Sequence, residues 1–221
     1  MRNERVRSVE TTTHGRVLLD VPALPGPHRL LVGFHGYGEN AERHLEQLRR
    51  LPGLDAWALA CVQGLHRFYA PKTEEIVASW MTRQDREQAI GDNVAYIDRV
   101  FAVVTADLGT PSRLVYAGFS QGVAMAFRAA TLGTARADGI IALGGDVPPD
   151  VCERPAARFG RVLLGRGTRD TWYTEAKLQA DLTQLRSLGV GVEAVVFDGG
   201  HEWTDAVRAA ASQFLHTLAP P

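Results

Sequence analysis

Short strand-like and helix-like runs alternate along most of this chain. Near the N-terminus, residues 6–10 and 16–21 alternate apolar and polar side chains, and we expect them to pair as an antiparallel hairpin that turns at His14-Gly15. Residues 29–34 form a largely apolar run, which is typical of a strand buried on both faces. Further strands are predicted over residues 56–62, 113–117, 139–143, 161–164 and 192–197.

Segments with helical spacing lie between these strands. Leu45, Leu48 and Leu51 recur on one stripe of a helix predicted over residues 42–51. The other helices are predicted over residues 87–108, 121–130, 174–188 and 204–218. Repeated strand–helix units predict an α/β fold with a mostly parallel central sheet, the antiparallel N-terminal hairpin and helices on both faces. We see neither a linker nor an insertion large enough for a cap domain, so we expect a single domain over residues 1–221.

Composition and charge narrow the choice of partners. The 221 residues include 24 basic and 25 acidic side chains, and a formal charge of −1 argues against nucleic acid or an anionic membrane as a partner. Cys61 and Cys152 are too few and too far apart for a disulfide scaffold or a metal cluster. No apolar signal-like run opens the chain, so we expect a cytoplasmic protein without stable membrane association that acts on a small molecule. A homodimer is left open.

The sequence Gly118-Phe119-Ser120-Gln121-Gly122 lies between a predicted strand and a predicted helix, where a nucleophile elbow belongs. About 0.06 matches to Gly-x-Ser-x-Gly are expected by chance in a chain of this composition. The glycines have a steric reason, because a serine on so sharp a turn is strained and a Cβ two positions away would collide with its neighbours. The alternative is a plain glycine-rich turn.

A serine nucleophile needs a base, and two histidines follow it in the chain. His201 comes directly after the strand over residues 192–197, whereas His216 lies within the last predicted helix, so we choose His201. The carboxylate that orients the base belongs between the two in this chain order. Asp170 fits best, and Asp146, at the end of the preceding strand, is the competitor.

Acyl transfer also needs donors for the negative oxygen of the tetrahedral intermediate. One should be the backbone N–H of Gln121, at the start of a helix. The other should come from the loop after Phe34, whose two glycines let an amide turn toward the serine, and we choose Tyr37. His35 in this loop is more simply a structural residue that braces it.

These motifs together resemble one family, the phospholipase/carboxylesterase family of α/β-hydrolases, which includes acyl-protein thioesterases and small bacterial esterases. The matching residues are Phe34-His35-Gly36-Tyr37-Gly38, Gly118-Phe119-Ser120-Gln121-Gly122, Asp170 and Gly200-His201-Glu202, in the family's order. The resemblance implies a lidless serine esterase without a cofactor. In it Ser120, Asp170 and His201 would be the catalytic triad, with Tyr37 and Gln121 as oxyanion donors.

Aromatic residues surround the predicted site in the sequence. The long connection over residues 63–86 carries Phe68, Trp80 and Met81, while Trp172 and Trp203 adjoin the acid and the base. They predict an aromatic rim suited to an apolar acyl or aryl group, and the alternative is that two or three of them seal the core. The histidine spacing indicates no metal site, and no Gly-x-Gly-x-x-Gly follows a strand, so we expect neither a metal nor a dinucleotide cofactor.

The sequence therefore predicts a serine carboxylesterase that hydrolyses small to medium carboxylic esters through an acyl-enzyme on Ser120. A thioesterase or a lysophospholipase would use the same machinery. A ligand-binding α/β-hydrolase that has lost catalysis is the alternative outside the enzymes.

Overall fold

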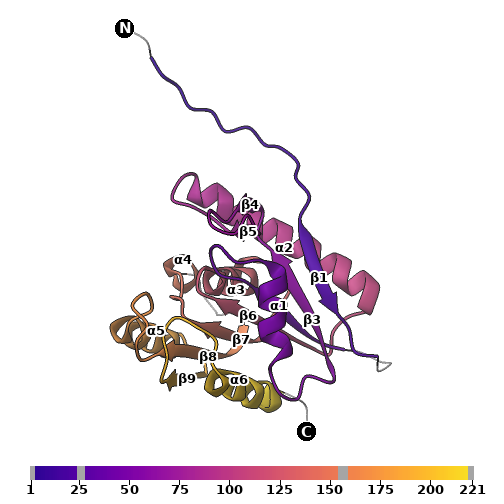
Figure 1. Cartoon of the computed structure of the whole chain (residues 1–221), viewed down its shortest axis with the longest axis vertical. Helices are drawn as coiled ribbons and strands as arrows, with labels where there is room; N and C mark the ends of the chain where they lie inside the picture. The colour runs from indigo at the N-terminus through magenta and orange to yellow at the C-terminus, as the bar shows by residue number, and fades with distance from the viewer. Residues whose placement is uncertain (1–2, 24–27, 154–158, 219–221) are drawn as a thin grey trace.

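A computed structural model describes residues 3–23, 28–153 and 159–218 (Figure 1). From residue 16 on, its elements follow one another in the order that the periodicity predicts, with one added hairpin (β4–β5) and one added short helix (α4). In chain order they are β1 (Arg16–Asp20), β2 (Arg29–Phe34), α1 (Ala41–Arg49), β3 (Trp57–Gln63), β4 (His66–Tyr69), β5 (Ile76–Ser79), α2 (Arg86–Leu108), β6 (Arg113–Phe119), α3 (Gln121–Leu132), β7 (Ala137–Leu143), α4 (Pro149–Cys152), β8 (Phe159–Gly167), α5 (Glu175–Ser187), β9 (Val192–Phe197) and α6 (Asp205–Leu218).

The large sheet has seven strands in the order β1-β3-β2-β6-β7-β8-β9, and only β1 runs antiparallel to its neighbour. Successive side chains of a strand point to opposite faces, so a fully buried strand feeds two cores. In β2, Leu30 and Val32 belong to the core on one face, which also contains residues of α2, α3 and α5, whereas Leu31 belongs to the core on the other face, with α1 and α6. This confirms the predicted fold: a mostly parallel sheet covered on both faces.

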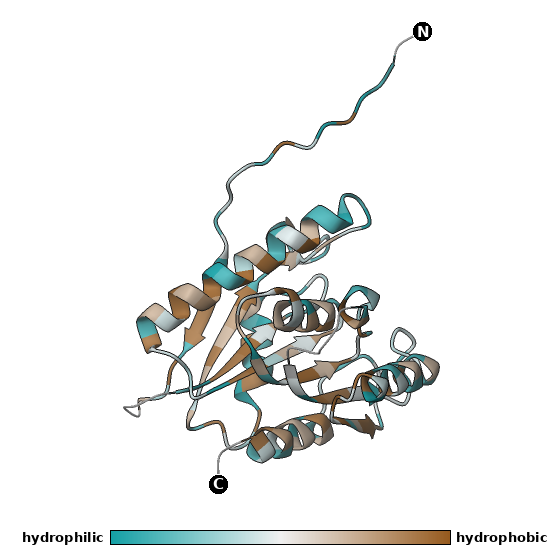
Figure 2. Ribbon diagram, turned by 180° about the vertical axis from the view of Figure 1, so that it is seen from behind, coloured by the Kyte–Doolittle hydropathy of each residue, from teal (hydrophilic) through white to brown (hydrophobic). Residues whose placement is uncertain are grey.

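The predicted N-terminal hairpin is wrong in its pairing. β1 pairs with β3, from Arg16 opposite Gln63 to Asp20 opposite Leu59, and residues 3–15 contain no strand. Val6 and Val9 are more than 80% exposed, so pairing residues 6–10 with β1 would bury too little apolar surface to offset the entropy of ordering them. This segment extends away from the sheet in Figure 1 and is mostly hydrophilic in Figure 2.

The connection predicted as a long loop contains a second, two-stranded sheet. β4 and β5 pair antiparallel, and a bridge between Glu39 and Ala78 ties β5 to the loop that follows β2. Most residues of β4 are exposed, so its sequence lacks the apolar alternation that announces a strand.

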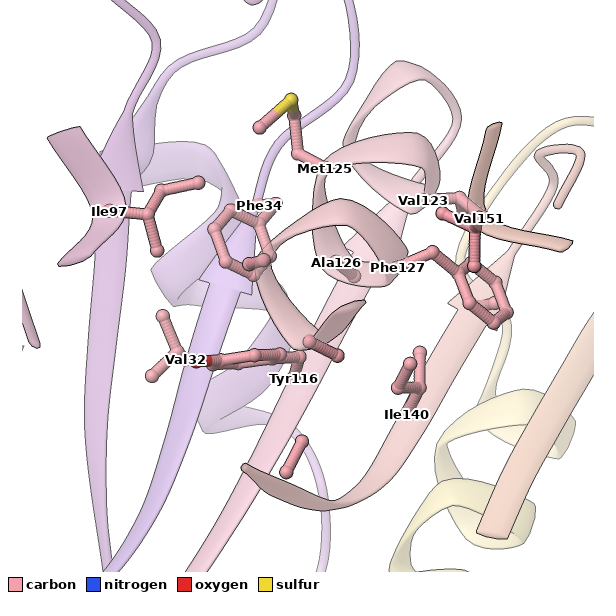
Figure 3. Close-up of a cluster of buried hydrophobic side chains, with 14 of the residues drawn as sticks. Val32, Phe34, Ile97, Tyr116, Val123, Met125, Ala126, Phe127, Ile140 and Val151 are labelled. Carbon is pink, nitrogen blue, oxygen red and sulfur yellow. The ribbon is translucent and has the colours of Figure 1, made fainter. Parts of the chain in front are cut away.

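A tightly packed cluster holds α3 against the sheet (Figure 3). Phe34 meets Tyr116 edge to face, with their ring centroids 5.6 Å apart, and Met125 and Phe127 of α3 are fully buried in the same core. Because Ser120 precedes the first residue of α3, this packing fixes where the serine lies. Among the described residues, no helix is both long and apolar enough to span a membrane.

Candidate active site

Ser120 occupies the sharp turn between β6 and α3. Its backbone has φ 53° and ψ −118°, a conformation that L-residues rarely adopt and that costs energy. A Cβ on Gly118 would lie 2.5 Å from the carbonyl oxygen of Gly122, and one on Gly122 would lie 2.0 Å from that of Phe34. The two glycines are therefore required by close backbone approach, as the elbow predicts.

Two backbone N–H groups, one at the start of α3 and one in the loop after β2, have no hydrogen-bond acceptor among the described residues. The N–H of Gln121 opens α3, where helix geometry provides no acceptor, and the N–H of Tyr37 lies in the loop after β2. Neither N–H donates a hydrogen bond to another residue of the described ranges. The close approach of Gly122 to the carbonyl oxygens of Phe34 and His35 brings this loop against the start of α3.

His201 and Asp170 are joined directly. His201 Nδ1 lies 2.8 Å from Asp170 Oδ2, and the other oxygen of Asp170 accepts hydrogen bonds from the backbone N–H groups of Trp172 (2.8 Å) and Tyr173 (3.0 Å). The Asp170 side chain is only 1% exposed, which leaves its carboxylate no freedom to rotate away. Asp146, the competing acid, forms an ion pair with Lys177 instead.

The two glycines that follow β7 lie against His201 and Ser120, respectively. A Cβ on Gly144, whose φ is +67°, would lie 3.0 Å from His201 Cε1, and one on Gly145 would lie 2.4 Å from the carbonyl oxygen of Ser120. The His201 ring also packs on Phe119, with 4.9 Å between ring centroids. Within the described part of the chain the Ser120 hydroxyl makes no hydrogen bond, so the serine and the imidazole are not hydrogen-bonded to each other.

A hollow of about 260 Å³ opens beside Ser120. The segment after β7 supplies half of its lining residues, and three charged residues are among the twelve. Its lining residues are Arg86, Ser120, Gln121, Ala124, Gly144, Gly145, Asp146, Val147, Pro148, Pro149, Trp172 and Lys177.

The five residues predicted as an aromatic rim are divided between surface and core. Trp172 lines the hollow and is 74% exposed, Phe68 stacks on Tyr37 at 5.6 Å, and Trp203 packs beside Phe119 at 6.3 Å. Trp80 is fully buried and Met81 is 7% exposed, so neither belongs to a rim. These two seal the core, the alternative that the sequence had left open.

The burial of Trp80 has a direct physical cause. Its indole N–H donates to the carbonyl oxygen of His35 at 2.8 Å, and its ring packs edge to face on Phe34 at 5.7 Å. A buried indole needs both an acceptor and apolar contacts, and both lie beneath the loop after β2.

His35 braces this loop, as expected. Its Nδ1 donates to the carbonyl oxygen of Gly36 at 2.7 Å, and its Nε2 accepts from the N–H of Gly64 at 3.0 Å, which defines one neutral tautomer. Burial lowers the pKa of His35 to about 4. A histidine with both nitrogens engaged cannot serve as a second base.

Glu39 was not among the predicted site residues. The N–H of Gly36 donates to its Oε2 at 2.7 Å, and burial raises the pKa of this carboxyl group, although Gly36, Arg43 and His201 act in the opposite direction. The signal in the sequence is a carboxylate three residues after the first glycine of the loop, which is too common to single out. Among the described residues, no group of three or more His, Cys, Asp or Glu side chains could hold a metal ion.

The sheet order, the elbow and the paired histidine and aspartate at the carboxyl ends of the strands define an α/β-hydrolase. Residues 25–218 match the model of the phospholipase/carboxylesterase family, and the chain belongs to this family of esterase- and thioesterase-like hydrolases. No curated protein matches the sequence significantly.

Solved structures with the same fold include esterases and a thioesterase. Esterase PE8 is 21% identical, with a TM-score of 0.72 over 93% of this chain and 98% of its own. The Zea mays acyl-protein thioesterase 2 is 17% identical, with a TM-score of 0.69 over 93% and 99%. A phospholipase/carboxylesterase from Dyadobacter fermentans DSM 18053 is 22% identical, with a TM-score of 0.68 over 94% and 99%.

Proposed function

We propose that this protein is a serine carboxylesterase that hydrolyses small to medium carboxylic esters through an acyl-enzyme on Ser120. The observation that carries the proposal is the 2.8 Å contact between His201 and the buried Asp170, beside a strained serine at the start of α3. This is the arrangement that turns a serine hydroxyl into a nucleophile.

The chemistry follows from the tautomer of His201. Asp170 accepts a hydrogen bond from Nδ1–H, so Nε2 is free to take the proton of the Ser120 hydroxyl as Oγ bonds to the ester carbonyl carbon. The serine–imidazole hydrogen bond forms when substrate is bound, since such contacts often tighten only in that complex. The N–H groups of Tyr37 and Gln121 then donate to the oxyanion.

Collapse of this intermediate breaks the bond between the carbonyl carbon and the leaving oxygen. His201 passes its proton to the departing alcohol, and the acyl group remains on Ser120. Water then hydrolyses the acyl-enzyme by the same steps. His201 takes a proton from water as the water oxygen adds to the acyl carbon. His201 then returns the proton to Ser120 Oγ as the bond between Oγ and the acyl carbon breaks.

The size of the site supports short acyl groups. The hollow beside Ser120 has a volume of about 260 Å³, and Arg86, Asp146 and Lys177 line it with charge. A long apolar chain would have to lie against these charged groups. It would displace water from them, which costs free energy. We therefore place short-chain esters ahead of long-chain thioesters and lysophospholipids.

Ser120→Ala tests this proposal. It should lower kcat for p-nitrophenyl acetate on the order of 10⁶-fold, because the triad acts as one unit. In the unsubstituted enzyme, rates across p-nitrophenyl esters of rising chain length should fall as the chain lengthens, and an acyl-CoA and a lysophospholipid should be poorer substrates. A Ser120→Ala variant that keeps most of its turnover would refute the serine mechanism. Faster turnover of the acyl-CoA or the lysophospholipid would reassign the substrate.

A further inference from the structure

Both parts of the oxyanion site contact one short segment, residues 78–81, which comprises the last two residues of β5 and the two that follow. On the side of the loop after β2, Gly38 N–H donates to the carbonyl oxygen of Ala78 at 3.0 Å, and Ala78 N–H donates to that of Glu39 at 2.7 Å. These two bonds are made by the two residues that directly follow Tyr37. Tyr37 lies between Gly36 and Gly38, and these hydrogen bonds therefore restrain the loop next to the Tyr37 N–H.

The same segment holds the side chain of Gln121. Gln121 Oε1 accepts from the backbone N–H of Trp80 at 2.9 Å, and Gln121 Nε2 donates to the carbonyl oxygen of Met81 at 2.8 Å. Ser79 Oγ lies 3.2 Å from the same Oε1. The side chain is thus fixed at both of its polar atoms, and its own backbone N–H is the second oxyanion donor.

The segment is itself rigidly held from behind. The indole N–H of Trp80 donates to the carbonyl oxygen of His35, and Asn93 Nδ2 of α2 donates to the carbonyl oxygen of Trp80 at 2.7 Å. Ala78 and Trp80 are fully buried, and Ser79 is 3% exposed. Groups bonded in this way cannot shift independently of the core.

We propose that residues 78–81 act as a positioning clamp that fixes the two oxyanion donors relative to each other. Donors contribute to catalysis only if both point at the same oxygen, within about 2.7–3.1 Å of the place it takes in the transition state. One donor starts a helix and the other lies in a glycine-rich loop, so a shared partner keeps their separation constant. Gln121, through its side chain, and Trp80 are positioning residues of the proposed esterase reaction.

Gln121→Met tests the clamp, because it keeps the backbone N–H and the side-chain length but removes the hydrogen bonds to Trp80 and Met81. We expect kcat for p-nitrophenyl acetate to fall about 10- to 100-fold with KM within about threefold, since the loss falls on the transition state. Trp80→Phe removes the indole N–H to His35, together with part of a fully buried ring, and should lower kcat in the same way. If Gln121→Met does not fold, Trp80→Phe decides the question.

The double variant distinguishes a shared clamp from two separate contacts. Its loss in kcat should exceed the larger single loss by no more than about threefold, whereas independent effects would multiply. Gln47→Met is the matched control: this glutamine of α1 bonds Arg208 on the other face of the sheet, and the variant should lose stability but keep kcat.

The proposal rests on the proposed function, yet the two fail differently. Absence of ester turnover in the unsubstituted protein would overturn the function. Normal turnover there, with kcat within twofold in Gln121→Met or Trp80→Phe, would overturn the clamp alone. Multiplicative losses in the double variant would replace it with two independent supports.

Discussion

At the scale of single residues, the sharpest constraints are steric. Gly122 is the clearest example, because its missing side chain makes room for the carbonyl oxygens of Phe34 and His35 at the base of the nucleophile turn. The sequence identified this position from the motif alone. It did not identify the Gln121 side chain, because hydrogen bonds between segments about 40 residues apart leave no local pattern.

Two Gly→Ala variants measure this constraint. In Gly122→Ala the new Cβ would lie 2.0 Å from the Phe34 carbonyl oxygen, so unfolding in urea should show a loss of about 3 kcal/mol or more. Gly91, an exposed position within α2, has open space where the Cβ would be, and Gly91→Ala should gain about 0.5–1 kcal/mol. Equal effects at the two sites would contradict the packing described for the turn.

At the scale of elements, burial decides what the sequence reveals. Strands β2, β3, β6, β7 and β8 cross the middle of the sheet, and their apolar runs identified them. Strand β1 was found but given the wrong partner, since alternation predicts a strand and not its neighbour. The β4–β5 hairpin was missed because little of β4 is buried.

The loop after β2 predicts a pH dependence of stability. Burial lowers the pKa of His35 from its ordinary 6.5 to about 4, so the unfolded chain binds a proton at a higher pH than the folded protein does. Stability is therefore complete above pH 6.5 and falls as the pH drops toward 4, by about 2–3 kcal/mol at pH 4.5. His44, whose pKa burial lowers to about 3, adds a loss of the same sign.

Urea unfolding between pH 7.5 and 4.5 checks this expectation. His66→Ala, at an exposed position of β4, should follow the same curve as the unsubstituted protein. Constant stability over this range would mean that burial does not hold His35 and His44 neutral in the folded protein.

At the scale of the whole molecule, strand order explains how distant residues meet. Ser120 follows β6, Asp170 follows β8 and His201 follows β9, so all three stand at the carboxyl edge of one sheet. Strand β7 lies between the strands that carry the nucleophile and the acid, and the glycines that follow it, Gly144 and Gly145, leave space for His201 and for the Ser120 backbone. Residues far apart in the chain are thus brought to one edge of the sheet because the strands that precede them are parallel.

The choice between Asp146 and Asp170 as the acid could not be made from the sequence alone. Asp146 and Asp170 both follow strands of this sheet, and chain order favours neither decisively. Geometry separates them, since His201 bonds Asp170 while Asp146 pairs with Lys177. The aromatic residues are a second case: Trp80 and Trp172 look alike in the sequence, yet one is fully buried and the other is 74% exposed.

The most direct test of the central claim is the rate at which a fluorophosphonate labels the protein, followed by mass spectrometry. The account predicts one adduct, on Ser120, that forms in the unsubstituted protein and in Asp146→Asn at similar rates. Asp170→Asn should react on the order of 10³- to 10⁴-fold more slowly, because His201 loses the partner that sets its tautomer. No adduct on Ser120, or equal rates in Asp170→Asn and the unsubstituted protein, would contradict the account.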